Sequence, residues 1–235
     1  MPLITVSPKE TSEVLVNPSM GWTTFHSFNG DEVNKNYPRS SIAYFRLYWD
    51  QLEPQEGEYR WDIIDDIIAN ARRNDQDVAL RVSAMNGMNP TAKAGAKVRN
   101  YRVPEWFRNS GCGGKEFFDE ENRAAGTIPM WEPDYGDPLF LEKKCRLVTE
   151  LGRRYDEHPN LDHMDIGSLG RWGEWHCAAV PMPALSARKQ IVDTYLSVFK
   201  KTPLLMLVAD QEAMAYAISK GTGWRADCMG DTRQG

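Results

Sequence analysis

The chain has 235 residues, of which 28 are lysine or arginine and 33 are aspartate or glutamate, so its formal net charge is −5. Such a chain has no basic excess to neutralise phosphates, which argues against a nucleic-acid partner. Hydrophobic residues make up 41% and charged residues 26% of the sequence, as in ordinary globular proteins. No run of about 18 apolar residues predicts a membrane span. The eight tryptophans suit either a packed core or a cleft for sugars and aromatic ligands.

The cysteines and the N-terminus leave the compartment open. Cys112, Cys145, Cys177 and Cys228 lie far apart and none belongs to a CxxC motif, so we expect free thiols instead of a zinc-ribbon or redox site. Residues 1–5 lack the charged start and apolar core of a signal peptide. We expect a cytoplasmic protein, or a secreted or periplasmic one if a signal peptide was removed. The sequence does not indicate an oligomeric state.

Strand-like and helix-like segments alternate along the chain. In chain order we predict a strand at 20–27, a strand at 42–49, a helix at 61–74, a strand at 77–83, a helix at 139–155, a strand at 163–168, a helix at 184–200, a strand at 203–209, a helix at 211–220 and a strand at 224–229. The strand at 42–49 is apolar almost throughout, as expected for burial on both faces. The stretch from 84 to 136 is rich in glycine and proline and carries no predicted element.

This alternation predicts βαβ units around a parallel sheet. Neither GxGxxG nor GxxxxGK[ST] follows a predicted strand, so a nucleotide-binding doubly wound sheet is disfavoured. The other all-parallel architecture is the (β/α)8 barrel, which takes about 250 residues. We therefore predict an α/β fold in which residues 1–235 form a single (β/α)8 TIM-type barrel domain, truncated after about six strands and incomplete at the C-terminus. Either the chain is a fragment, or two strands escape the pattern.

Polar residues recur at the predicted carboxyl ends of the strands, where ligands bind in both all-parallel architectures. In strand order they are His26; Arg46, Tyr48 and Trp49; Arg81 and Ser83; the run from Arg171 to His176; Asp210; and Asp227 with Asp231. Charged residues begin most loops, but their recurrence over successive strands favours one shared binding site.

Glu174 is the candidate catalytic residue. It follows a buried strand and lies between Trp172 and Trp175, while Gly173 allows a close approach of the backbone. Apolar walls favour the neutral form of a carboxyl group, which suits a proton donor near neutral pH. The alternative is a solvated loop glutamate, or one that pairs with an arginine inside the barrel.

Arg46 and Arg81 lie within apolar strands, and an unpaired buried guanidinium is very costly. We expect both to pair with carboxylates, for which Asp165, Glu174 and Asp210 are the candidates. Such pairs would either be structural ion pairs inside the barrel or would orient the catalytic carboxylate and a substrate hydroxyl. The sequence leaves both interpretations open.

A metal centre and a serine nucleophile both lack support. His26, His163 and His176 could converge in the fold, but no HExxH or comparable spacing accompanies them. No GxSxG elbow occurs either. We therefore predict no metal and no cofactor, and keep a metal-dependent hydrolase on the same barrel as a weaker alternative that a metal assay would test.

Two stretches resemble a known family. Residues 44–49 (YFRLYW) and 52–62 (LEPQEGEYRWD) resemble the "W…lEPxeGxYxwd" segment of clan A glycoside hydrolases, and most of all that of the family 35 and family 42 beta-galactosidases. Weaker likenesses to the third strand of those enzymes, to their "lPxWl" loop and to uncharacterised barrel proteins filed beside them lie at 77–83, at 103–107, and at 16–22 with 172–176. The EPxxGxY element is the most specific part of this likeness.

The resemblance implies a barrel whose fourth strand delivers the general acid/base glutamate, and Glu174 occupies that place. Two departures stand out. Gly173 precedes it where the family usually has asparagine, and the family's nucleophilic glutamate comes from strand seven, which this sequence does not contain. Asp210, Asp227 or Asp231 could replace that nucleophile only in a different geometry.

From the resemblance we infer a glycoside hydrolase-like protein that cleaves a β-linked, galactose-type sugar, with Glu174 protonating the glycosidic oxygen. The residues expected to bind this carbohydrate substrate are His26, Arg46, Trp49, Arg81, Trp172, Trp175, His176 and Asp210. The alternative is a catalytically inactive or truncated barrel that binds carbohydrate. The missing strand-seven glutamate and the absent asparagine favour that alternative.

Overall fold

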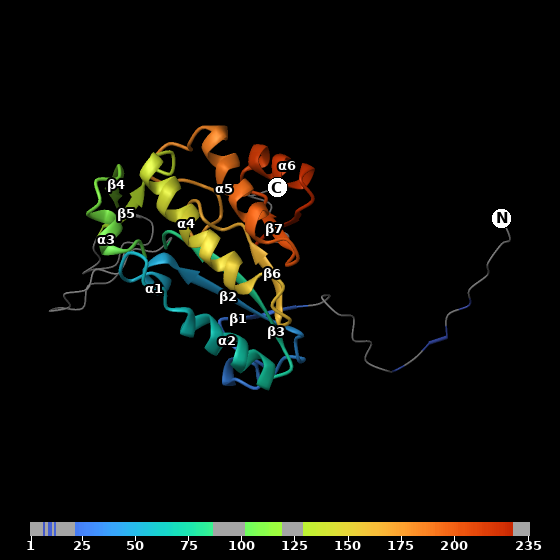
Figure 1. The fold of residues 1–235 in the computed structure, drawn as a ribbon. Coiled ribbons are helices and arrows are strands. Elements are labelled where there is room, and N and C mark those ends of the chain that lie inside the picture. Colours follow the sequence, from blue (N-terminus) through green and yellow to red (C-terminus); the bar gives the residue numbers. More distant parts are fainter. Residues whose placement is uncertain are drawn as a thin grey trace, which may run out of the picture.

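The computed structural model describes residues 22–86, 102–118 and 129–227, together with residues 7, 9, 10 and 12. Its main sheet has six strands in the order β1-β2-β3-β6-β7-β8, and every neighbouring pair is parallel (Figure 1). The bounds are β1 Thr24–Phe25, β2 Ile42–Tyr48, β3 Asp77–Ser83, β6 Leu161–Asp165, β7 Leu204–Leu207 and β8 Gly223–Arg225. The predicted α/β class with a parallel sheet is thus confirmed. Among the described strands the sheet is open, with β1 and β8 at its two ends.

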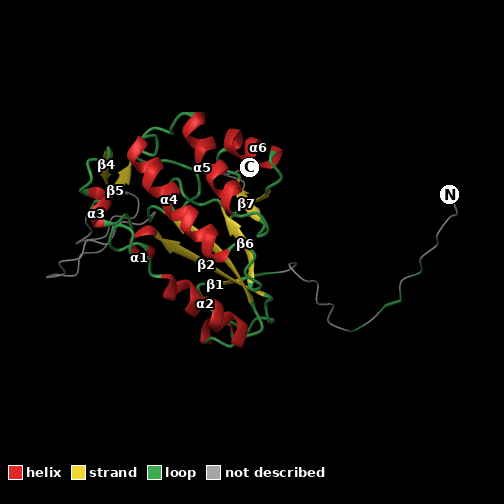
Figure 2. Cartoon of the chain, viewed as in Figure 1, coloured by secondary structure: helices red, strands yellow, loops and turns green. Residues whose placement is uncertain are grey.

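Four longer helices cover one face of this sheet, as Figures 1 and 2 show. They are α2 Trp61–Arg73, α4 Pro138–Tyr155, α5 Leu185–Val198 and α6 Gln211–Ser219. Helix α4 packs on α5 and α5 on α6, while Asp65 of α2 pairs with Arg154 of α4 at 2.5 Å. The helices therefore follow one another in chain order, as the sheet strands do. No helix within the described ranges is long and apolar enough to cross a membrane.

The apolar sequences of β2 and β3 reflect burial on both faces of the sheet. The main core includes Phe45, Leu80 and Val82, which share one cluster with Ile64 and Ile68 of α2. A second, smaller cluster consists of Ile42, Tyr44 and Ala79. Because side chains alternate across a strand, these two sets lie on opposite faces of the sheet. We call the face that carries the Ile42 cluster, on the side without the helices, the inner face of the sheet.

The stretch from 84 to 136 is not without structure, which corrects our expectation. It contains the short helix α3 Glu105–Arg108 and an antiparallel hairpin of β4 Gly114–Phe117 and β5 Met130–Pro133. A Cβ on Gly114 would lie only 2.2 Å from the Trp131 ring. This glycine therefore marks close packing between hairpin strands, and short strands with such breaks carry too little alternation to be predicted.

Two further elements, the 3-10 helix η1 Glu32–Asn34 and the one-turn helix α1 Trp49–Leu52, are too short to predict. The predicted strand bounds also shift. The strand expected at 163–168 is β6, which ends at Asp165, although Ile166 N still donates to Leu205 O at 2.9 Å. Residues 20–21 and 228–229 of two predicted strands, Cys228 and Asp231 lie outside the described residues, as do residues 16–21 of the family likeness.

Candidate functional site

The inner face of the sheet carries a row of charged side chains near the carboxyl ends of its strands. Strand register places Arg46 of β2 beside Arg81 of β3, and Arg81 beside Asp165 of β6. Arg225 in β8 and Asp227 just after it reach the same row from the far end of the sheet. The parallel register thus gathers five charged residues from four separate strands.

Asp165 is the buried centre of the row, since its side chain and that of Arg81 are both 0% exposed. Its Oδ2 accepts hydrogen bonds from Tyr44 OH at 2.9 Å, from Arg81 Nε at 3.0 Å and from Arg225 Nη1 at 3.2 Å. Burial, reinforced by the Asp165 carboxylate, raises the pKa of Tyr44 above its usual value. Tyr44 therefore stays protonated and serves as a hydroxyl donor.

Glu174 and Asp227 form an upper layer above this centre. Arg46 Nη2 lies 3.2 Å from Glu174 Oε1 and 3.6 Å from Asp227 Oδ2. Arg81 donates to Asp227 with both terminal nitrogens, at 2.9 and 3.1 Å, and Arg225 Nε lies 2.9 Å from Asp227 Oδ1. Arg81 Nη1 also lies 3.5 Å from Glu174 Oε1. Both carboxyl groups are partly exposed, at 22% and 19%, so a ligand can reach them.

The same two carboxyl groups share the guanidinium groups of Arg46 and Arg81. Burial acts to raise the pKa of Asp227, but the hydrogen bonds and charge of Arg81, together with the charge of Arg225, hold it well below its usual range. Asp227 is therefore an ionised carboxylate at any pH at which the protein would work.

A tight turn of the backbone presents Glu174. Gly173 has a φ of +75°, and a Cβ there would lie 2.1 Å from the carbonyl oxygen of Gly167. Only glycine fits such a position without displacing the neighbouring chain, so the departure from the family's asparagine has a local cause. Trp172 and Trp175 flank it with φ values of 52° and 61°, which are unusual for residues with a side chain.

Buried partners secure this turn on both sides. Trp175 is 0% exposed, and its indole N–H donates to Ile166 O at 2.5 Å. On the other side, the fully buried Glu132 of β5 accepts hydrogen bonds from the backbone N–H groups of Ala178, Ala179 and Val180. The hairpin that we did not predict therefore holds the segment that follows Glu174.

Three predicted residues lie around the upper layer. His176 Nε2 is 3.4 Å from Glu174 Oε2, and the Trp172 ring centroid lies 6.2 Å from that of His176. His26 Nε2 accepts a hydrogen bond from the backbone N–H of Arg46 at 3.3 Å. Burial, with the Arg46 charge, lowers the pKa of His26, so this ring is a neutral acceptor at neutral pH.

Two predicted tryptophans belong to the core instead. Trp49, like Trp175, is 0% exposed, and its indole N–H donates to Glu53 Oε2 at 2.7 Å. Glu53 Oε1 in turn binds the Gly57 N–H at 2.8 Å and Arg146 Nη2 at 2.7 Å. A sugar cannot stack on a ring without exposed surface, so we leave both tryptophans out of the proposed site.

Asp210 is also engaged elsewhere. Arg188 Nη1 donates to its two carboxylate oxygens at 2.7 and 2.8 Å, and the Ala213 N–H donates to Oδ1 at 3.1 Å, which caps helix α6. Of the three carboxylates that we considered as partners for Arg46 and Arg81, only Asp165 and Glu174 lie against these arginines.

Sequence reasoning missed Tyr44, Glu132 and Arg225. The signal for Arg225 was present, because residues 223, 225 and 227 alternate onto one face of a strand and Asp227 had already been noted. Glu132 had none, since it lies in the stretch without predicted elements. Among the described residues, no three histidine, cysteine or acidic side chains cluster as metal ligands, and the described cysteines Cys112, Cys145 and Cys177 are free thiols.

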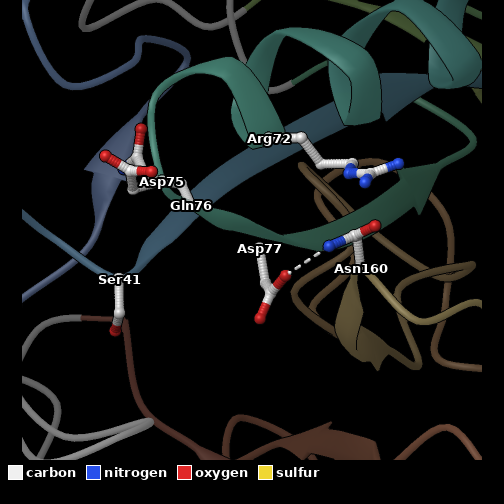
Figure 3. Close-up of a pocket in the computed structure, with 6 residues that line it drawn as sticks. All are labelled: Ser41, Arg72, Asp75, Gln76, Asp77 and Asn160. Carbon is white, nitrogen blue, oxygen red and sulfur yellow. Dashed lines mark hydrogen bonds between the residues drawn. The ribbon is translucent and has the colours of Figure 1, made fainter.

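The hollow beside the charged layer is small, about 30 Å³, and Glu174, Arg225 and Asp227 line part of it. A larger polar hollow of about 240 Å³ lies where β3 begins, at the opposite end of the strand from Ser83. Figure 3 shows Arg72 of α2 on one side of it, with Asn160 donating to Asp77 at 2.9 Å. This second hollow is separate from the Glu174 layer.

Comparison with protein families finds one model, described as beta-galactosidase of glycoside hydrolase family 42, which matches residues 37–169. These residues include Arg46, Arg81 and Asp165, and Glu174 follows shortly after them. A comparison with curated proteins finds no significant match.

Among solved structures, the chain is similar to endo-glycoceramidase II from Rhodococcus sp., with 14% identity, a TM-score of 0.46 and coverage of 71% of this chain and 40% of that one. It is similar to the exo-beta-1,4-mannosidase Op5Man5 from Opitutaceae bacterium strain TAV5, with 14% identity, a TM-score of 0.44 and coverage of 74% and 27%. For the beta-galactosidase from the psychrophilic Marinomonas ef1, the values are 15%, 0.41, 69% and 32%. The chain thus spans 40% or less of the length of these three proteins.

Proposed function

This chain belongs to glycoside hydrolase family 42, the beta-galactosidase family, and we propose that it cleaves a β-linked, galactose-type sugar with Glu174 as the proton donor. The observation that carries the proposal is the convergence of Arg46 and Arg81 on the Glu174 carboxyl group, at 3.2 and 3.5 Å. This convergence lies at the carboxyl ends of parallel strands, where barrel enzymes have their active sites.

We further propose that the six strands are part of a (β/α)8 barrel. Their strict chain order, their parallel pairing and the helices along one face support a barrel. The open sheet, with β1 and β8 at its ends, has room for two more βα units between them. Such units would close the inner face over the charged row and deepen the small hollow beside Glu174.

In this function Glu174 gives its proton to the glycosidic oxygen as the bond to the leaving group breaks. Arg46 and Arg81 hold the carboxyl group in place, and His176 and the partly exposed Trp172 contact the sugar. The second carboxylate of a glycosidase stands about 5–5.5 Å away in retaining enzymes and about 6.5–9.5 Å away in inverting ones. Asp227 shares the guanidinium groups of Arg46 and Arg81 with Glu174 and is further bound by Arg225. We infer that Asp227 is not the nucleophile and that the nucleophile comes from another barrel unit, as the family resemblance implies.

Replacing Glu174 by glutamine tests this function. General acid catalysis contributes about 10²–10⁴-fold, so we expect turnover of phenyl β-galactoside to fall by that order while thermal unfolding stays close to that of the wild type. Glu142→Gln, on the exposed side of α4, is the matched control and should keep full turnover. Unchanged turnover in Glu174→Gln would refute the assignment of Glu174 as the proton donor.

A second candidate function is carbohydrate binding without hydrolysis. The pairing of Asp227 with Arg81 and Arg225 favours it, because a carboxylate held in this way is not free to act as the second catalytic carboxylate. Calorimetry with galactose-type oligosaccharides separates the two functions. Binding with no released sugar supports the binding protein, whereas product formation supports the hydrolase.

A further inference from the structure

An exposed aromatic ring lies beside the charged upper layer, at the end of the edge strand β1. Phe25 is the last residue of β1 and is 57% exposed. It pairs in register with Tyr44 of β2, and the two rings stack with 5.8 Å between their centroids and 18° between their planes. Because Tyr44 belongs to the Ile42 cluster, the Phe25 ring lies on the inner face of the sheet. It therefore stands at the carboxyl end of its strand, where barrel proteins bind their ligands.

Neighbouring groups hold this ring on three sides. Besides Tyr44, the His26 ring meets it edge-on, with 4.4 Å between the ring centroids, and the guanidinium carbon of Arg46 lies 5.7 Å from its centroid. His26 is itself anchored, since its backbone N–H donates to Tyr44 O at 3.0 Å and its Nε2 accepts from the Arg46 N–H at 3.3 Å. Its φ of 52° turns the chain sharply after Phe25. The Phe25 ring is thus both exposed and fixed in orientation.

Arg46 connects this ring to the proposed proton donor. The same guanidinium group that contacts the Phe25 ring places its Nη2 3.2 Å from Glu174 Oε1. A ligand that lies on the Phe25 ring would therefore lie beside the Glu174 carboxyl group. Because Trp49 and Trp175 are buried in the core, they cannot supply a flat apolar surface here, whereas Phe25 can.

We propose that Phe25 is the platform on which the galactose ring of the substrate stacks. The inference rests on the proposed function and adds to it a binding residue that the sequence did not indicate. The axial hydroxyl group of galactose leaves three neighbouring C–H groups on the opposite face of the sugar. The face of an aromatic ring is electron-rich and attracts such weakly positive groups, while a nearby guanidinium binds the hydroxyl groups at the edge of the sugar. An exposed ring beside Arg46 offers both kinds of contact.

Binding of methyl thio-β-galactoside to the full chain, measured by calorimetry, tests this role. The probe is not cleaved and has no aromatic aglycone that could stack in place of the sugar. Phe25→Leu keeps an apolar side chain but removes the flat face, so we expect the Kd to rise about three- to tenfold. Phe25→Tyr keeps the ring and should stay within about twofold of the wild type. Because the ring is largely exposed, neither variant should shift the midpoint of urea unfolding.

Trp224→Leu is the matched control. Trp224 is a 60% exposed aromatic residue of the other edge strand, β8, and it faces the opposite side of the sheet from its neighbour Arg225. Its Kd should equal that of the wild type. A wild-type Kd in Phe25→Leu, or an equal loss of affinity in Trp224→Leu, overturns the role of Phe25.

Failure of the proposed function gives a different result. If the wild-type protein does not bind the thiogalactoside, the galactose-type substrate is wrong and the platform is overturned with it. If it binds the thiogalactoside with the expected loss in Phe25→Leu but releases no phenol from phenyl β-galactoside, the hydrolase is overturned and the platform is supported.

Discussion

Replacing Gly173 by alanine tests how tightly the chain holds the turn that presents Glu174. The backbone at Gly173 has a φ of +75°, and the new Cβ would lie 2.1 Å from Gly167 O. The left-handed conformation costs a residue with a side chain roughly 1 kcal/mol. Moving a packed backbone carbonyl adds about 1–3 kcal/mol, as other overpacking substitutions do. We therefore expect Gly173→Ala to lower the free energy of unfolding by about 2–4 kcal/mol.

Gly57→Ala is the matched control, because it separates the two causes. Gly57 has nearly the same φ, +77°, but nothing lies within 4 Å of the Cβ that alanine would add. This control should lose only the roughly 1 kcal/mol of the backbone term. Urea unfolding followed by tryptophan fluorescence gives both values. Equal losses in the two variants would refute the close contact between the Glu174 turn and Gly167.

Two other predictions concern buried charged groups outside the site. Burial lowers the pKa of Lys144 to about 7, although the negative charge of Glu53 acts in the opposite direction. Between this pH and about 10.4, the usual pKa of lysine, the unfolded chain binds this proton and the folded protein does not, so the free energy of unfolding rises with pH. Lys144→Met should remove that rise and increase the free energy of unfolding by about a few kcal/mol at pH 7. Urea unfolding of both proteins at pH 7 and pH 10 tests this, and an equal rise in their free energies of unfolding would contradict it. Glu132→Gln would turn an amide N–H donor toward three backbone N–H donors and should lower the free energy of unfolding by about 2–3 kcal/mol. A loss of stability within the error of thermal unfolding would speak against the role of Glu132 in holding the segment after Glu174.

Hydrophobic periodicity was sufficient to predict the frame of the fold. The run at β2 is apolar on both faces because Phe45 packs in the main core on one face and Tyr44 in the Ile42 cluster on the other. A run of this kind at regular spacing from amphipathic helices has few solutions other than a parallel sheet. The hairpin of β4 and β5 escaped because its stability comes from contacts such as Trp131 against Gly114, which no local pattern encodes.

The site was harder to predict than the sheet, because residue type does not show what a side chain already binds. Trp49 and Trp175 have the right chemistry for a sugar platform, yet both indole N–H groups are used inside the core. Asp210 is at a strand end, yet it belongs to Arg188 and the start of α6. Burial and partner choice are tertiary properties, and they decide these three positions.

The most specific part of the family likeness is structural in this protein. Within the EPxxGxY element, Glu53 is fully buried and binds Trp49, Gly57 and Arg146. It thereby connects the segment after β2 to helix α4. A residue with this many obligatory partners tolerates little change, which explains why the motif identifies the scaffold more clearly than it identifies the chemistry.

The charged layer also supplies what a proton donor needs after it has reacted. In the proposed function Glu174 becomes a carboxylate when it gives up its proton, and Arg46 Nη2 and Arg81 Nη1 already lie 3.2 and 3.5 Å from its Oε1. Preorganised cations of this kind stabilise a developing charge without further rearrangement. The two arginines thus support the ionised form. A residue that must serve first as acid and then as base passes through that form, which gives a reason for two arginines inside apolar strands.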